Sequence, residues 1–178
     1  MARSAVASRQ LRIIGVEIRL PDHSQPTSAG VPAWMELIVE VENTGTRNLH
    51  VWASHRGYEY DPASRLLTLH LAERPLVVPP NVIVISQHPR APDQIEVGGK
   101  SRVKIRLRVP PFIRRRAQDG RGWIEDPIGT VDHVDVRVQY ALQPFDKPAK
   151  NETENEYRER MQTHGDVVQE RITPGVQR

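Results

Sequence analysis

Residues 102–109 read RVKIRLRV, an unbroken alternation of basic and aliphatic side chains. Successive side chains of a β-strand point to opposite faces of its sheet. A strand with this sequence presents one apolar face to a core and one cationic face to solvent. The stretch therefore predicts a half-buried strand, and the same period of two recurs along the chain.

Five further segments repeat this alternation, and a shorter apolar run lies among them. The alternating segments are 14–20, 34–42, 49–52, 66–71 and 133–140, and the shorter apolar run is 82–85. The breaks between them carry turn residues, such as NTG at 43–45, DP at 61–62 and GG at 98–99. No helical pattern long enough for a βαβ crossover precedes residue 110. About seven short strands predict an all-β fold, an immunoglobulin-like antiparallel β-sandwich.

The sandwich is predicted to span residues 11–145, after an N-terminal arm of residues 1–10. Residues 146–178 are interpreted as a C-terminal extension that begins with a polar linker over 146–151. Thr153 and Glu156 have the spacing of a capping box, which predicts the start of a short helix. Gly165 is placed to end that helix.

Tyr157 and Met161 lie one turn apart on the predicted helix. A helix of about 10 residues is not stable alone. It therefore either docks through Tyr157 and Met161 or is partly disordered. A docked helix makes these two residues candidates for a partner contact, including a contact with another copy of the chain.

Two stretches of the predicted sandwich resemble bacterial immunoglobulin-like modules. Residues 37–45 followed by 49–51 resemble their strand–NTG–strand step, and IEVGGKS at 95–101 followed by 103–109 resembles their glycine-bearing entry into a later strand. The resemblance covers roughly residues 11–145 and is to adhesion-type CARDB modules, the fibronectin type III domain and BsuPI-like intracellular proteinase inhibitors. It implies a binding or scaffolding fold without a built-in active site. The stretch 110–130 is longer than these modules lead us to expect, and the C-terminal extension is additional.

Composition excludes several classes of protein. The chain has 178 residues and no cysteine, which excludes disulfides, thiolate metal sites and cysteine nucleophiles. No apolar run approaches the ~18–20 residues of a membrane span, and no signal-peptide core follows Arg3 and Arg9. We therefore expect a cytoplasmic protein, or one delivered without a classical signal peptide, that does not insert into a membrane. The net charge of +3 is compatible with binding an acidic partner but does not require one.

The cationic face of 102–109 has an acidic counterpart. Glu36, Glu40 and Glu42 alternate along the segment 34–42. Opposite charges on neighbouring strands stabilise each other, so the two segments are predicted to pair through a cross-strand ion-pair network. The alternative is a flat cationic surface that contacts phosphates or an acidic partner.

Residues 110–130 hold the first candidate binding surface, because basic residues and an indole gather there. The candidates are Arg114, Arg115, Arg116, Arg121 and Trp123. Guanidinium groups bind phosphate and indole rings stack on bases. The alternative is a solvated basic loop in which the indole covers one end of the sandwich. After the prolines at 110–111, residues 112–118 are expected to form about two helical turns.

Trp52, Tyr58 and Tyr60 form an aromatic group near the third alternating segment. Trp52 falls on the face opposite its aliphatic neighbours, where solvent is expected. We expect a long loop to cover this face and bury Trp52. Exposure for a protein or sugar contact is the alternative.

The chain has seven histidines, and five of them, at positions 50, 55, 70, 88 and 133, are candidates for a metal site. Three of them, converging with Asp61 or Asp135, would make a zinc or iron site. The chain has no H-E-x-x-H motif, no phosphate-binding glycine loop and no G-x-S-x-G elbow. We therefore assign no catalytic residue and expect no cofactor.

Three hypotheses for function follow. The first is a non-enzymatic protein-interaction or structural module that binds another protein or a second copy through 110–130, a sheet edge or the tail. The second is an anion or nucleic-acid binder that uses the arginine-rich loop. The third is a metal-dependent enzyme that uses converging histidines.

Overall fold

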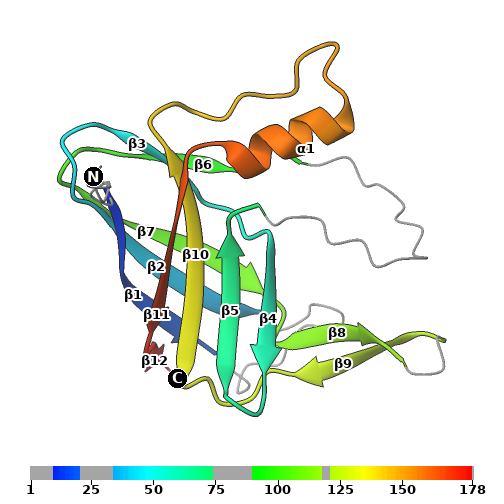
Figure 1. Ribbon diagram of the computed structural model, residues 1–178. Helices are drawn as coiled ribbons and strands as arrows, with labels where there is room; N and C mark the ends of the chain where they lie inside the picture. Colours follow the sequence, from blue (N-terminus) through cyan, green and yellow to red (C-terminus); the bar gives the residue numbers. More distant parts are fainter. Residues whose placement is uncertain (1–9, 21–33, 74–89, 118–120, 178) are drawn as a thin grey trace, which may run out of the picture.

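The computed structural model describes residues 10–20, 34–73, 90–117 and 121–177, which form mostly β-strands and one helix (Figure 1). The elements are β1 (Leu11–Arg19), β2 (Met35–Asn43), β3 (Leu49–Trp52), β4 (Gly57–Asp61), β5 (Leu66–Leu71), β6 (Gln94–Val97), β7 (Arg102–Val109), β8 (Phe112–Arg116), β9 (Trp123–Pro127), β10 (His133–Ala141), α1 (Glu154–Thr163), β11 (Asp166–Ile172) and β12 (Gly175–Gln177).

The strands form two main sheets and a separate hairpin. One sheet has the order β12-β1-β2-β7, and the other has the order β4-β5-β10-β3-β6, with β11 also paired to β10. Aliphatic side chains from both sheets, among them Val39, Leu69 and Val136, are fully buried in one shared hydrophobic core. The prediction of an all-β fold is therefore confirmed. The apolar run 82–85 and the arm 1–9 lie outside the described residues.

The predicted pairing of the basic and acidic segments is confirmed. β2 and β7 are antiparallel, and their register places Glu36 opposite Arg108, Glu40 opposite Lys104 and Glu42 opposite Arg102. Arg102 binds Glu42 with an N–O distance of 2.9 Å.

The ion-pair network on this face also extends to β1. Lys104 binds Glu17 of β1 at 3.1 Å, and Arg19 of β1 binds Glu36 at 3.3 Å. The hydrogen bond and the charge of Lys104 lower the pKa of Glu17. Arg102 and Lys104 of β7 thus take partners from the neighbouring strand β2 and from β1 beyond it.

The structure corrects three expectations about the strands. β5 pairs with β10, and β1 with β12, in parallel, so the sheets are not wholly antiparallel. The helical turns expected over 112–118 are not formed by 112–116, which make strand β8, paired along its length with β9; residue 118 lies outside the described residues. The sheets also continue past Phe145, because β11 pairs with β10 and β12 pairs with β1.

The short helix is confirmed. Thr153 caps α1, and its side chain and that of Glu156 form the reciprocal hydrogen bonds of a capping box. Gly165 follows the helix with a φ of +73°, a left-handed conformation that favours glycine.

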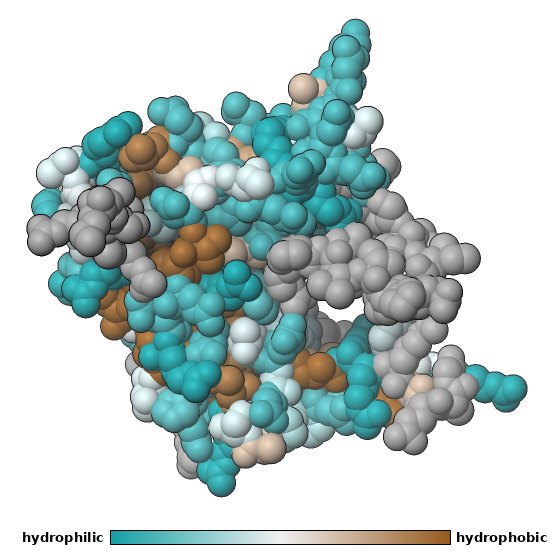
Figure 2. Space-filling view, viewed as in Figure 1, coloured by the Kyte–Doolittle hydropathy of each residue, from teal (hydrophilic) through white to brown (hydrophobic). Residues whose placement is uncertain are grey.

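The helix docks on the outer face of the second sheet. Trp52, Phe145, Tyr157 and Met161 form one buried cluster between them. Trp52 is buried as predicted. The expected cover was a long loop, whereas α1 and the segment before it cover Trp52 in the structure. Tyr157 and Met161 are 2% and 0% exposed, so their surface is used inside the chain and not for a partner contact. The outside of this region is hydrophilic (Figure 2).

A buried glutamine anchors the C-terminal end of the helix. The side-chain amide of Gln139 donates hydrogen bonds to the carbonyl oxygens of Met161 (2.6 Å) and His164 (2.8 Å). Its carbonyl oxygen accepts one from the backbone N–H of Glu73 at 3.0 Å. Gln139 therefore satisfies carbonyl groups that a helix end leaves without partners.

An ion pair fixes the segment that leads into α1. Arg160 donates two hydrogen bonds to the carboxylate of Glu152, at 2.7 and 2.8 Å, and stacks 4.5 Å above the Phe145 ring. The hydrogen bond from Arg160 is the main cause that lowers the pKa of Glu152 from 4.5 to about 2. This carboxylate remains ionised in the folded protein at pH values where an ordinary glutamate is protonated.

Acid is therefore expected to weaken the docking of α1. Because the pKa of Glu152 is lower in the folded state, its contribution to stability is complete above pH 4.5 and is lost as the pH falls toward 2. Urea unfolding of wild type and Glu152→Gln, measured across this range, should show a larger loss in wild type than in the variant, which keeps only the loss from other carboxylates such as Glu17. Parallel pH profiles of the two proteins would contradict this role.

Candidate functional site

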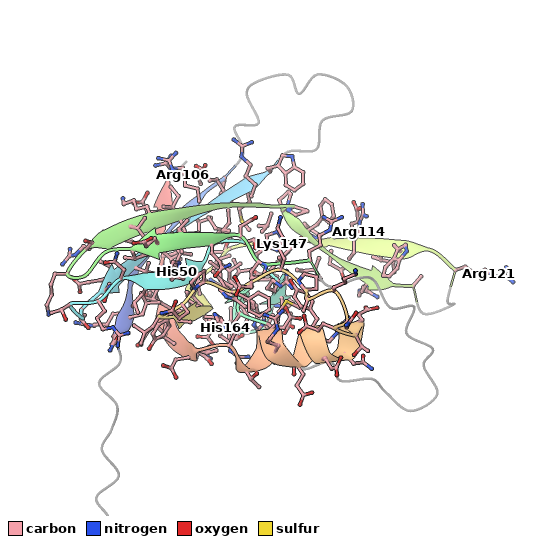
Figure 3. All side chains as sticks on the ribbon, turned by 90° about the horizontal axis from the view of Figure 1, so that it is seen from above. His50, Arg106, Arg114, Arg121, Lys147 and His164 are labelled. Atoms are coloured by element: carbon pink, nitrogen blue, oxygen red, sulfur yellow. The ribbon has the colours of Figure 1, made fainter. Side chains whose placement is uncertain are left out.

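The β8–β9 hairpin projects from the two main sheets. Its two strands pair only with each other among the described residues, in register from Phe112 opposite Pro127 to Arg116 opposite Trp123. Figure 1 shows the hairpin leaving the body beside β4, and Figure 3 shows Arg121 at its far end. A two-stranded hairpin gains little stability alone. Such an arm is therefore a candidate for a contact surface.

Two of the candidate arginines are paired inside the hairpin. Arg114 binds Glu125 on the opposite strand, with N–O distances of 2.8 and 2.9 Å. Arg115 binds Asp126 at 2.5 Å. The alternative of a solvated basic loop at 110–130 is therefore wrong, because residues 112–116 and 123–127 form paired strands and β9 supplies a carboxylate to each of these two guanidinium groups.

The other three candidates lie toward the tip. Trp123 begins β9 and is 66% exposed, so it does not cover the end of the sandwich. Arg116 is opposite it in the register, although the described part of the structure does not include its side chain. Arg121 is exposed. The structure thus brings all five candidates onto one hairpin, with ion pairs near its base and an exposed indole near its tip.

A pocket lies where the hairpin joins the body. It has a volume of about 300 Å³ and is lined by three aromatic rings, a proline and an arginine, namely Trp34, Tyr58, Phe112, Pro110 and Arg114. These residues come from four separate stretches: the entry to β2, strand β4, the β7–β8 link and strand β8.

The walls of the pocket are held in place by specific contacts. The Tyr58 hydroxyl donates a hydrogen bond to the carbonyl oxygen of Phe112 at 3.0 Å. The Arg114 guanidinium lies 5.5 Å from the centre of the Phe112 ring. Burial raises the pKa of Tyr58, and the charge of Arg114 opposes this rise. The polar groups of Tyr58 and Arg114 already have protein partners, so the pocket offers mainly apolar and aromatic surface to an occupant.

The sequence indicated only part of this site. It pointed to the arginines and Trp123, but the pocket also needs Trp34 and Tyr58. One signal was available: Trp34 falls on the solvent side of its segment, and it is 43% exposed in the structure. Tyr58 belonged to the aromatic group near Trp52, yet the two lie in different environments.

The histidines do not form a metal centre in the part of the chain that the structure describes. Within those residues, no three His, Asp or Glu side chains are grouped so as to hold a metal ion. His70 is buried in β5, whereas His133 is exposed at the start of β10. His88 lies outside the described residues.

None of the helices in the described residues is long and apolar enough to cross a membrane. Comparison with known proteins adds no relative. No protein-family model matches the chain, and neither curated proteins nor solved structures show a significant match.

Proposed function

We propose that this chain is a non-enzymatic protein-interaction module, an immunoglobulin-like β-sandwich whose contact arm is the β8–β9 hairpin. The observation that carries the proposal is Trp123, a large aromatic side chain that is 66% exposed on a projecting arm. Tryptophan and arginine dominate the binding energy of protein interfaces. Both sheets share one core, which supports the sandwich part of the proposal.

The charges of the arm favour a protein over a nucleic acid. Glu125 and Asp126 occupy the guanidinium groups of Arg114 and Arg115. A phosphate backbone would have to displace both carboxylates, which repel it. Protein interfaces instead typically have an aromatic residue at the centre and a polar or charged rim around it.

The other surfaces that the sequence suggested fit a contact less well. The apolar residues of α1 are buried under their own chain. β7 is an edge strand of eight residues. Every second side chain of β7 faces outward, and these outward side chains are all basic. Charged edges are a common protection against strand addition.

Affinity capture tests the proposal. Tagged wild type, Trp123→Ser and Leu142→Ser would be used to retain proteins from the same cell extract. Leu142 is a matched control, because it is also an exposed apolar residue but follows β10 at the opposite end from the hairpin. We expect wild type and Leu142→Ser to retain the same proteins, and Trp123→Ser to retain at least tenfold less of each. Equal retention by all three proteins would overturn the hairpin as contact arm.

A further inference from the structure

Two arginines of β7 lack the carboxylate partners that the other cations of this strand have. Both Arg106 and Arg108 are exposed. The register places Arg106 opposite the buried Ile38. Arg108 lies opposite Glu36, but that carboxylate binds Arg19 of β1 at 3.3 Å. Within the described residues no carboxylate pairs with either arginine, so both are available to an anionic group of another molecule.

The row of arginines leads to the pocket at the base of the hairpin. Met35 and Val109 are paired and buried, so both face the core. Trp34 and Pro110 lie one residue beyond this pair and line the pocket. Because successive side chains of a strand alternate between faces, they fall on the outward face that Arg108 shares. The two arginines and the aromatic pocket are thus consecutive on one surface.

The spacing of this surface fits an extended chain. Positions 106, 108 and 110 are two residues apart, which is about 6.6 Å per step at ~3.3 Å per residue. A partner segment in extended conformation repeats the side chains of one face at the same interval. Figure 3 shows Arg106 of β7 and Arg114 of the pocket on the same side of the molecule. One face of such a segment can therefore reach the pocket and both β7 arginines together.

The length of the cationic row favours carboxylates over phosphates. Beyond Arg106, Lys104 binds Glu17 at 3.1 Å. Arg102 binds Glu42 at 2.9 Å. The available positive charge of β7 is therefore limited to two residues, bordered by carboxylates that repel a longer polyanion. Two acidic side chains match this row, whereas a nucleic-acid backbone continues past it with further negative charges.

We infer that the partner of this module is an acidic protein segment, which inserts an aromatic side chain into the pocket and places two carboxylates, at alternate positions, on Arg108 and Arg106. The inference rests on the proposed function, because it assigns the chemistry of the partner that the hairpin contacts. The aromatic walls of the pocket favour an aromatic side chain through ring–ring packing. The segment lies over the outward face and adds no strand to β7, so the charged edge keeps its protection.

Fluorescein-labelled peptides of this pattern test the inference by fluorescence anisotropy with the full chain. The peptides GSFSESESG and GSESESFSG place the ring before or after the two glutamates, since either chain direction gives the same spacing. At least one should bind at low salt with a dissociation constant of about 10–100 μM, as expected of a small contact with exposed ion pairs. Replacing both glutamates by glutamine should weaken that peptide about tenfold. Replacing phenylalanine by alanine should also weaken it about tenfold or more.

Variants of the protein separate specific recognition from general charge. Arg108→Ala and Arg106→Ala should each weaken peptide binding about three- to fivefold. Arg102→Ala is the matched control, because it removes the same charge from the same strand at a residue already bound to Glu42, and it should leave binding unchanged. Trp34→Ala should weaken binding about fivefold or more through the loss of a pocket wall. Near-ultraviolet circular dichroism checks that each variant is folded.

Three results would overturn the inference: neither peptide binds, the glutamine peptide binds as tightly as the glutamate peptide, or Arg102→Ala weakens binding as much as Arg108→Ala. Oligothymidine that displaces the labelled peptide at a lower concentration than the unlabelled peptide does would overturn it in favour of a nucleic acid. If the peptides fail but loss of Trp123 still reduces capture from the extract, the acidic partner falls and the hairpin stands as contact arm. If the peptides bind as expected but capture does not depend on Trp123, the arm falls and the pocket keeps its ligand.

Discussion

Replacing Trp52 by alanine is expected to lower the free energy of unfolding by about 3–5 kcal/mol, the usual cost of emptying a large aromatic site. Trp52 is fully buried and lies 6.1 Å from Phe145, ring centre to ring centre. It belongs to the cluster through which α1 covers the sheet. Urea unfolding followed by far-ultraviolet circular dichroism measures the change.

Trp52→Phe is the matched control. The indole N–H of Trp52 is buried without a hydrogen-bond partner among the described residues. Phenylalanine therefore removes volume but no hydrogen bond, and it should cost less than half as much as alanine. An alanine variant as stable as wild type, or a phenylalanine variant as unstable as the alanine variant, would contradict this account of α1.

Gly165→Ala is expected to destabilise the protein by about 2–4 kcal/mol through two effects. The residue has a φ of +73°, where a Cβ is strained. A Cβ at this position would also collide with the carbonyl oxygen of Tyr140 and lie 2.7 Å from the Cβ of Ala141. The backbone of β10 cannot move aside without disturbing its pairing with β11. The midpoint of thermal unfolding should fall accordingly.

Gly122→Ala separates the two effects. Gly122 also has a positive φ, +89°, but a Cβ there meets none of the described residues within 4 Å. Only the conformational strain remains, at roughly 1 kcal/mol. Equal losses for the two variants would show that the collision with Tyr140 contributes nothing.

The alternation of apolar and polar residues predicted the strands that have one buried and one solvent-exposed face. β7 is the clearest case, because its basic and aliphatic residues also identified β2 as its neighbour. The sequence of β11, DVVQERI, has no regular alternation, so its place beside β10 was not foreseen. The parallel pairing of β5 with β10 was also missed, because alternation shows which face of a strand is buried but not its direction.

The site was predicted in composition but not in arrangement. The arginines of β8 were recognised, whereas Glu125 and Asp126, placed before Pro127, resemble a turn in the sequence. Only the hairpin register brings Glu125 opposite Arg114 and places Asp126 within reach of Arg115. The pocket was not predictable, because Trp34, just before β2, and Tyr58, in β4 of the other sheet, meet the hairpin only in the folded chain.

The central claim is that the hairpin is the contact surface, and the three tryptophans of the chain test it directly. With fluorotryptophan incorporated, 19F nuclear magnetic resonance gives one signal each for Trp34 in the pocket, Trp123 near the tip and the buried Trp52. Tryptophan-to-phenylalanine variants assign these signals. As a captured partner is added, the signals of Trp123 and Trp34 should shift while that of Trp52 stays fixed. Complex formation that leaves the signals of Trp123 and Trp34 unchanged would place the contact elsewhere on the molecule and contradict the account.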